Sequence, residues 1–137
     1  MKSLTDVIAR SGKTRQPSES EEQKAVFEWA AAFERVYPEL FLLAAIPNGG
    51  YRNPREAARL RAEGVKAGVP DMILFVARGG YHGLAIEMKR QRAYKISPKQ
   101  ICWMRRMSEQ GWYAVVCQGA VQAQNIITKY LLGQIVV

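Results

Sequence analysis

The sequence predicts a single domain of the α/β layered class, and three observations lead to this prediction. The chain has 137 residues, a length typical of one domain. Hydrophobic residues make up 48% of it, enough for one buried core and too many for a disordered chain. Patterns typical of helices and strands follow one another in the order α, β, α, β, β, α, β, α. In that order a β-hairpin leads through a crossover helix to one more strand.

The N-terminal part of the chain is expected to contain a flexible basic arm followed by a helix. Residues 1–18 are polar and basic, so we expect them to form the arm. Ser18 or Ser20 can cap a helix that runs to about Val36, because apolar side chains recur there at helical spacing. That stripe consists of Val26, Trp29, Ala30 and Phe33. Residues 40–46, an apolar run of strand length, then predict the first strand.

The middle of the chain predicts a second helix and a β-hairpin. Residues 47–50 (PNGG) are typical of a turn. We expect a helix over residues 53–64, because it starts with Asn-Pro, typical of an N-cap and first helical position, and ends at a glycine. Residues 71–77 and 83–89 predict two strands, joined by a turn at residues 78–80 (RGG).

The C-terminal part predicts two helices with a strand between them. Ser97 can cap a helix over residues 98–110, which a glycine ends. Residues 112–117 (WYAVVC) predict a strand, and residues 120–132 predict the last helix. We therefore expect residues 19–137 to form one domain.

The charge balance points to a polyanionic partner. Lysine and arginine number 20 against 12 acids, a net charge of +8, which favours nucleic acid. No apolar run approaches the roughly 18 residues that a membrane span needs, and the N-terminus lacks the apolar segment of a signal peptide. We expect a cytoplasmic protein, neither secreted nor bound to a membrane.

Cysteine and histidine are too few for several kinds of site. Cys102 and Cys117 cannot build a disulfide framework, which favours a reducing compartment. Since His82 is the one histidine, a Cys/His zinc site and a histidine-dependent nucleophile triad are both excluded. We interpret His82 itself as a surface residue. Any metal ion is expected on carboxylates.

Two carboxylates lie inside the apolar sequences of the predicted hairpin. Asp71 begins one strand and Glu87 lies near the end of the other, two residues before Lys89. If residues 78–80 form a three-residue loop, the register sets Asp71 directly opposite Glu87. Directly opposed side chains lie roughly 5 Å apart, close enough to share a divalent ion. A two-residue loop would shift this register by one residue.

The two faces of the hairpin are expected to differ. Glu87 and Lys89 are two residues apart and share a face. The opposite face is apolar and consists of Met72, Leu74, Val76, Leu84, Ile86 and Met88. A buried carboxylate is unfavourable by several kcal/mol unless it is paired or binds a metal, so two of them need a cation.

A carboxylate pair beside a lysine fits metal-assisted hydrolysis of a phosphodiester. Mg²⁺ polarises the phosphate and lowers the pKa of a bound water, while the lysine positions that water or stabilises charge on phosphorus. The alternative is a structural ion pair between Lys89 and an acid on a partly exposed hairpin, because the D…ExK pattern alone is short and common.

Two short motifs, VPD at 69–71 and IEMK at 86–89, contain the two acids and the lysine. Together they resemble the signature of the PD-(D/E)xK nucleases. Further characteristic stretches are ESEEQKAVFEWA (19–30), AIPNGG (45–50), EGVKAGVPD (63–71), ARGGYHGLAIEMKR (77–90) and SPKQ (97–100). With them the chain resembles, more narrowly, the VRR-NUC (virus-type replication–repair nuclease) domain of the stand-alone phage and bacterial kind.

The resemblance implies a restriction-endonuclease-like three-layer fold, with a mixed central sheet and a catalytic hairpin flanked by helices. It implies dependence on Mg²⁺, with Mn²⁺ as a substitute, and cleavage of branched DNA such as Holliday junctions or flaps. Asp71, Glu87 and the Met88 carbonyl would be the metal ligands and Lys89 the catalytic lysine. The resemblance also marks Gln100 as an active-site residue.

Many such nucleases take a fourth acid from the first helix. Glu19, Glu21 and Glu22 are the candidates. We choose Glu22 as a possible metal ligand, with Gln23 as helper, because Glu22 lies on the core-facing stripe of the helix. Glu19 and Gln23, four residues apart, share a flank of the same helix. The alternative is that all three acids only stabilise the helix N-terminus.

Basic residues that we expect to contact DNA phosphates lie in two places. Arg52 begins a cluster around the second helix, and the second cluster follows the proposed catalytic strand and consists of Arg90, Arg92, Lys95 and Lys99. The Asn48-Gly49-Gly50 loop can lie near the phosphate. We interpret Trp29, Trp103 and Trp112 as core residues because they lie on apolar stripes.

Together these patterns predict an Mg²⁺-dependent, structure-selective DNA endonuclease. We expect a homodimer, because a junction must be cut in two strands and a chain of 137 residues has room for one site. The alternatives are a non-catalytic basic DNA-binding module and a sequence-specific restriction-type nuclease.

Overall fold

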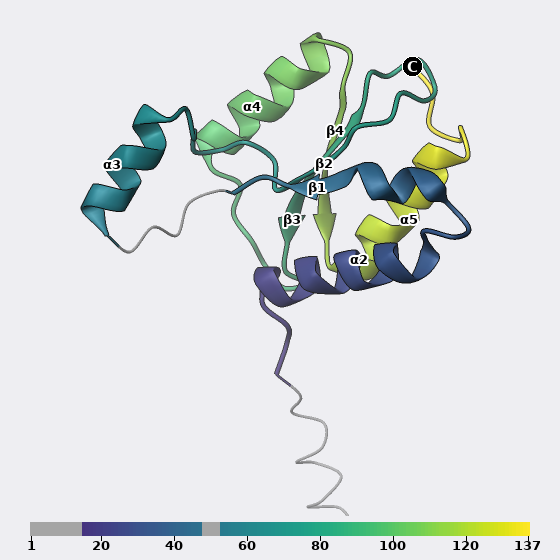
Figure 1. Cartoon of the computed structure of the whole chain (residues 1–137), viewed down its shortest axis with the longest axis horizontal. Coiled ribbons are helices and arrows are strands. Elements are labelled where there is room, and N and C mark those ends of the chain that lie inside the picture. Colours follow the sequence, from purple (N-terminus) through teal and green to yellow (C-terminus); the bar gives the residue numbers. More distant parts are fainter. Residues whose placement is uncertain (1–14, 48–52) are drawn as a thin grey trace, which may run out of the picture.

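A computed structural model describes residues 15–47 and 53–137 of the chain (Figure 1). Its elements, in order, are α2 (Glu19–Phe33), the 3-10 helix η1 (Pro38–Leu42), β1 (Leu43–Ala45), α3 (Pro54–Ala62), β2 (Met72–Leu74), β3 (Leu84–Lys89), α4 (Pro98–Glu109), β4 (Tyr113–Gln118) and α5 (Ala120–Leu131). No helix in these two stretches is long and apolar enough to cross a membrane. The predicted N-terminal arm lies outside the described residues up to residue 14.

The described strands form one mixed sheet in the order β1-β2-β3-β4. β1, β2 and β3 pair antiparallel, whereas β3 and β4 pair parallel because α4 crosses over between them. Helices α2 and α5 cover one side of the sheet and α4 the other (Figure 1). This is the predicted restriction-endonuclease-like, three-layer α/β fold.

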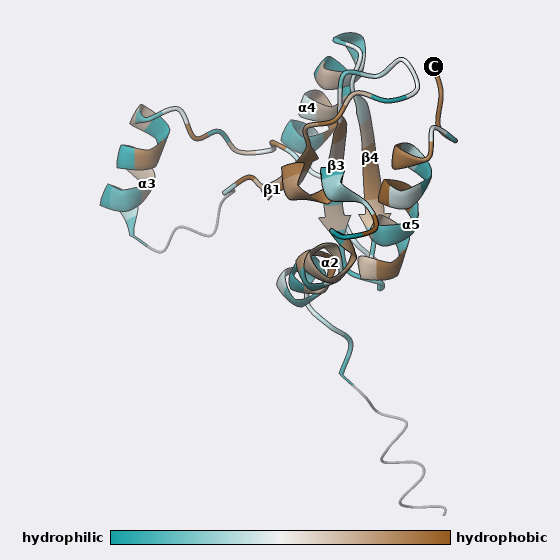
Figure 2. Cartoon of the chain, turned by 45° about the vertical axis from the view of Figure 1, so that its right-hand side comes forward, coloured by the Kyte–Doolittle hydropathy of each residue, from teal (hydrophilic) through white to brown (hydrophobic). Residues whose placement is uncertain are grey.

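The core lies between the sheet and the α2–α5 layer. All six side chains predicted for the apolar face of the hairpin are buried there. They pack against Val26 and Ala30 of α2 and Ala123, Ile127 and Tyr130 of α5. Figure 2 shows hydrophobic and hydrophilic residues alternating around α5, as expected for a helix with one buried face. The other face of β3 therefore carries Glu87 and Lys89 toward α4.

The hairpin has the predicted register but a different turn. Met72 pairs with Ile86 and Leu74 with Leu84, the register that sets residue 71 opposite residue 87. The turn is a two-residue Gly79-Gly80 turn between paired Arg78 and Tyr81, not the three-residue loop predicted. Both glycines have positive φ, 61° and 92°, which the tight turn requires. One extra residue on the first arm, between Leu74 and Arg78, offsets the shorter turn.

The strand predicted over residues 40–46 is wrong for its first half. Pro38 begins the 3-10 helix η1, and only Leu43–Ala45 pair with β2. The proline fixes φ in the helical range, and an apolar run of this length fits either element. The strand predicted over residues 71–77 is likewise shorter, since β2 is confined to Met72–Leu74.

Three helices begin at the predicted caps. The Ser18 and Ser97 side chains accept from the backbone N–H groups of Glu21 and Gln100, and each serine belongs to a complete capping box. Asn53 caps α3, with Pro54 at the first helical position. In contrast, α5 begins after Gly119, which offers no side chain to its N-terminus.

Candidate active site

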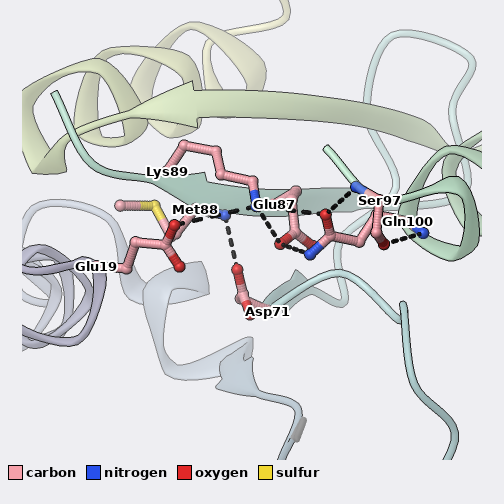
Figure 3. A network of polar contacts seen from close by, with 7 residues as sticks. All are labelled: Glu19, Asp71, Glu87, Met88, Lys89, Ser97 and Gln100. Atoms are coloured by element: carbon pink, nitrogen blue, oxygen red, sulfur yellow. Dashed lines mark hydrogen bonds and ion pairs between the residues drawn. The ribbon is translucent and has the colours of Figure 1, made fainter. Parts of the chain in front are cut away.

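Asp71 lies immediately before β2, and main-chain groups hold it on two sides. Its carboxylate Oδ2 accepts a hydrogen bond of 2.8 Å from the Met88 N–H of β3. Its own carbonyl accepts from the Ile46 N–H at 2.8 Å. These bonds place the Asp71 carboxylate at the start of β2, beside the part of β3 that carries Glu87 and Lys89 (Figure 3).

Glu87 is a buried carboxylate with half of its hydrogen-bonding capacity unused. Its side chain is 2% exposed. Oε1 accepts a hydrogen bond of 2.8 Å from the Gln100 Nε2, but Oε2 is buried without a hydrogen-bond partner among the described residues. Burial and the neighbouring negative charge of Asp71 raise the pKa of Glu87 from 4.5 to about 8. This site therefore holds a second negative charge only at a free-energy penalty.

Lys89 is the cation nearest to Glu87, yet the two do not form a close ion pair. The Lys89 side chain is buried, 6% exposed. Its Nζ lies 3.3 Å from the Gln100 Oε1, 3.9 Å from the Glu87 Oε1 and 4.0 Å from the Glu19 Oε1. Charge-assisted N–H···O bonds are normally about 2.7–2.9 Å long. The lysine thus lies among three acceptors without close pairing to either acid.

Gln100 connects these side chains, and the capping box of α4 sets its orientation. Its Oε1 accepts from the Ser97 N–H at 2.9 Å and from Lys89 Nζ. Because both donors approach the oxygen, the amide nitrogen is turned toward Glu87 (Figure 3). A helix cap thereby positions the Gln100 amide against Glu87. The structure brings together Asp71, Glu87, Lys89 and Gln100, as expected from the sequence.

The structure corrects the placement of Glu22. Glu22 is 4% exposed, but it faces α5: its Oε1 accepts from the Gln91 Nε2 at 2.8 Å and its Oε2 from the Ala120 N–H at 2.5 Å. It supplies the cap that Gly119 does not offer to α5. Glu21 is engaged as well, since it bonds Ser18 and Arg15. Neither acid reaches the Asp71–Glu87 pair.

Glu19 is the acid of α2 that faces the site. Besides its approach to Lys89, it lines a cavity of about 760 Å³ together with Gln23 and Asp71. The signal in the sequence was the spacing of Glu19 and Gln23, which places both on one flank of the helix. Gln91, which holds Glu22, was missed because its role depends on a contact between residues far apart in the chain.

The donor set fits a hard divalent cation. Carboxylates are the ligands that Mg²⁺ prefers, and here two of them face each other, one with a buried oxygen that finds no hydrogen-bond partner in the part of the chain that the structure describes. The Met88 carbonyl fits as a third ligand. Extending the hairpin register past β2 sets Met88 opposite Pro70, which has no N–H to donate to that carbonyl. No cluster of three or more acid, histidine or cysteine ligands occurs in the described stretches, so water or substrate oxygens would complete the set.

Some of the basic residues predicted to contact DNA phosphates lie around this site. Arg90 and Lys95 line a cavity of about 700 Å³ with Glu19. Lys99 is exposed beside Gln100, and Arg92 is exposed. Arg52 and the Asn48-Gly49-Gly50 loop lie outside the described residues.

The positions of Trp29 and His82 agree with the prediction, whereas the position of Trp103 does not. Trp29 packs against the core, as expected, and stacks on Phe33. Trp112 is half-buried over Gly83. Trp103, expected in the core, lies outside the core cluster and lines a surface cavity. His82 is exposed, as predicted.

Comparisons with known proteins agree with this arrangement. A family model described as "VRR-NUC domain" matches residues 14–121, which include all of these site residues. A solved structure named "VRR_NUC domain protein" is 31% identical to this chain, with a TM-score of 0.74. The similarity covers 88% of this chain and 93% of that one. No curated protein matches. The resemblance predicted from the motifs is confirmed.

Proposed function

This chain belongs to the VRR-NUC domain family, a nuclease family, and on that premise we propose that it is a divalent-metal-dependent DNA endonuclease. Phosphodiesters in branched DNA, such as Holliday junctions or flaps, are its proposed substrates.

The state of Glu87 is the observation that carries this proposal. A structural ion pair would bring Lys89 against the carboxylate and satisfy both of its oxygens. Here the Lys89 Nζ lies 3.9 Å from Glu87 Oε1, and Oε2 has no hydrogen-bond partner in the described part of the chain. Asp71 adds a second acid, so the pair, when both acids are ionised, has more negative charge than one lysine neutralises. This arrangement supports a cation-binding site over a structural hairpin contact.

Asp71, Glu87 and the Met88 carbonyl would hold the cation. When bound, Mg²⁺ or Mn²⁺ supplies a Lewis acid that polarises a phosphate oxygen and lowers the pKa of a water ligand. Asp71 stays oriented toward this position because its other oxygen is held by the Met88 N–H.

Lys89 is the proposed catalytic residue. Hydrolysis forms a bond between the water oxygen and phosphorus and breaks one ester P–O bond, so negative charge builds on the phosphoryl oxygens. A lysine ammonium held by Gln100 at the floor of the site stabilises that charge without reorganising. Glu19, 4.0 Å from Lys89, is the candidate fourth acid in place of Glu22.

A homodimer is proposed for the active form. Resolving a junction takes two symmetric cuts, and the described residues contain one Asp71–Glu87–Lys89 group. The turn after α2 and the helix η1 also expose large apolar side chains, with Val36 62% and Phe41 78% exposed, which suits a surface for a second copy. Light scattering on the purified chain measures this directly, and a monomer at micromolar concentration would contradict it.

The deciding experiment compares substrates and metals. The protein is incubated with labelled four-way junction, flap and linear duplex in Mg²⁺, Mn²⁺ or EDTA. We expect cleavage of the branched substrates in either metal and none in EDTA. Asp71→Asn is expected to abolish cleavage and leave DNA binding largely intact, because it removes negative charge near the phosphate. Glu56→Gln, on the exposed surface of α3, is the matched control.

Each alternative predicts a different outcome. A non-catalytic DNA-binding module would bind these substrates and cut none of them. A restriction-type nuclease would cut linear duplex at particular sequences as efficiently as junctions.

A further inference from the structure

We propose that a groove between residues 61–67 and α4 binds an unpaired nucleotide of single-stranded DNA, with the base stacked on Trp103. The proposal rests on the proposed function only in taking DNA as the ligand. It adds a binding site that the catalytic group does not include.

The groove is continuous along one side of α4. Two cavities of about 530 and 330 Å³ share Lys66, Cys102 and Trp103 in their walls, so each opens beside the other. The larger is within the range of small-molecule binding sites, about 300–1,000 Å³. A base with its sugar and phosphate is a ligand of that class.

The walls carry only positive charge. Arg61 and Lys99 line the first cavity, Arg106 lines the second and Lys66 lines both, whereas no acid from residues 15–47 or 53–137 lines either one. Four cations without a counter-charge repel one another and are stabilised by a polyanionic ligand. A nucleic-acid backbone has the matching charge.

Trp103 gives the groove a flat apolar surface. Its side chain is half-buried but does not belong to the hydrophobic core cluster. Trp112 also lines the second cavity. Base–aromatic stacking is worth about 1–3 kcal/mol per base and tolerates any sequence. The base faces of a continuous duplex are already stacked, so this surface suits an unpaired nucleotide.

The groove begins next to the proposed active site. Trp103 follows Gln100 by three residues on α4, about 4.5 Å along the helix axis. The opposite wall, residues 61–67, is followed by Gly68, which packs closely against α4. A Cβ on Gly68 would lie 2.7 Å from the Lys99 carbonyl carbon, and the φ of Gly68 is +94°, so a glycine is required there. The same segment leads directly to Asp71. An unpaired base in the groove therefore lies close to the strand that enters the active site.

The test measures binding in EDTA, so that it does not depend on cleavage. Full-length protein is titrated into labelled dT12 and a labelled 12-base-pair duplex. We expect Trp103→Ala to weaken dT12 binding about 5- to 150-fold, the equivalent of one stacked base, and to change duplex binding little. Trp103→Phe, which keeps an aromatic face, is expected to retain most of the affinity.

Neighbouring arginines on α4 provide a matched pair. Arg106 lines the groove and Arg105 does not, although both are exposed. Arg106→Ala is expected to weaken dT12 binding and lower the salt slope by about 0.7, the value for one phosphate contact on a single strand. Arg105→Ala is expected to leave the dT12 affinity and the salt slope unchanged.

Several outcomes would overturn the proposal. One is unchanged dT12 affinity in Trp103→Ala, and another is equal loss on dT12 and duplex. If Trp103→Ala does not fold, equal effects of the two arginine variants would refute it. A protein that cuts DNA but binds dT12 independently of Trp103 keeps the proposed function and loses this site. A protein that binds dT12 through Trp103 but never cuts DNA keeps this site and loses the proposed function.

Discussion

Replacing Glu87 by glutamine is expected to stabilise the metal-free protein at pH 8 while abolishing cleavage. Burial and the charge of Asp71 raise the pKa of Glu87 from 4.5 to about 8. Between these two values the unfolded chain is ionised at Glu87 whereas the folded protein keeps the proton. Stability therefore falls as the pH rises through this window, by on the order of 4 kcal/mol in total.

Glutamine reproduces the protonated form of this side chain. Its oxygen can still accept from the Gln100 Nε2, and its amide nitrogen can donate toward Asp71 from the position of the unpartnered Oε2. The variant and the wild type are therefore expected to differ by less than about 1 kcal/mol at pH 5. At pH 8 the variant is expected to be more stable by on the order of 4 kcal/mol.

Urea unfolding in EDTA at pH 5, 6.5 and 8 measures this difference. Glu22→Gln is the control, since Glu22 is equally buried but both of its oxygens accept hydrogen bonds. That variant is expected to lose stability at pH 8, the opposite sign. Added Mg²⁺ is expected to stabilise the wild type at pH 8 and not Glu87→Gln. If the difference in the free energy of unfolding between the wild type and Glu87→Gln does not increase from pH 5 to pH 8, the reasoning is refuted.

Three further variants test the surrounding residues. Lys89→Met is expected to lose most of its single-turnover rate while retaining metal and DNA binding, because the ammonium acts in the transition state; early melting with normal cleavage in the cold would point to a structural role instead. Ser97→Ala is expected to lower stability by about 1 kcal/mol, because the Gln100 N–H loses its Oγ cap, but to change kcat little, because the Ser97 backbone N–H still orients the Gln100 side chain; far-UV melting and cleavage are the two readouts. Gly68→Ala is expected to lower both stability and activity, because the new Cβ meets the Lys99 backbone at 2.7–2.8 Å, and unchanged melting would argue against that contact.

Local signals in the sequence were sufficient for much of the fold and part of the site. The caps at Ser18, Asn53 and Ser97 lie within three residues of the groups that they bond, so short motifs predict them. The alternation along the hairpin assigned the apolar face to the core and Glu87 and Lys89 to the other face. The register was derived from a three-residue loop, and it is correct only because an extra residue on the first arm offsets the two-residue turn.

The choice among neighbouring glutamates required the tertiary structure. Periodicity predicts correctly that Glu22 lies on the buried side of its helix. It does not predict which groups the buried side chain contacts. That side chain meets the Ala120 N–H, 98 residues away, because α5 begins after a glycine and needs an acceptor from elsewhere. Only Glu19 is left to face Lys89.

Trp103 is a second residue whose surroundings could not be predicted from its place on an apolar stripe. Periodicity indicates the side of α4 that faces inward, but whether that side meets a packed core or a groove depends on residues 61–67, which reach α4 from another part of the chain. The sequence alone therefore determined the order of the elements, the caps of three helices and the face of the hairpin that carries Glu87 and Lys89. Which acid of α2 faces the site and what surrounds Trp103 were decided by the tertiary structure, because both depend on contacts between segments that are far apart along the chain.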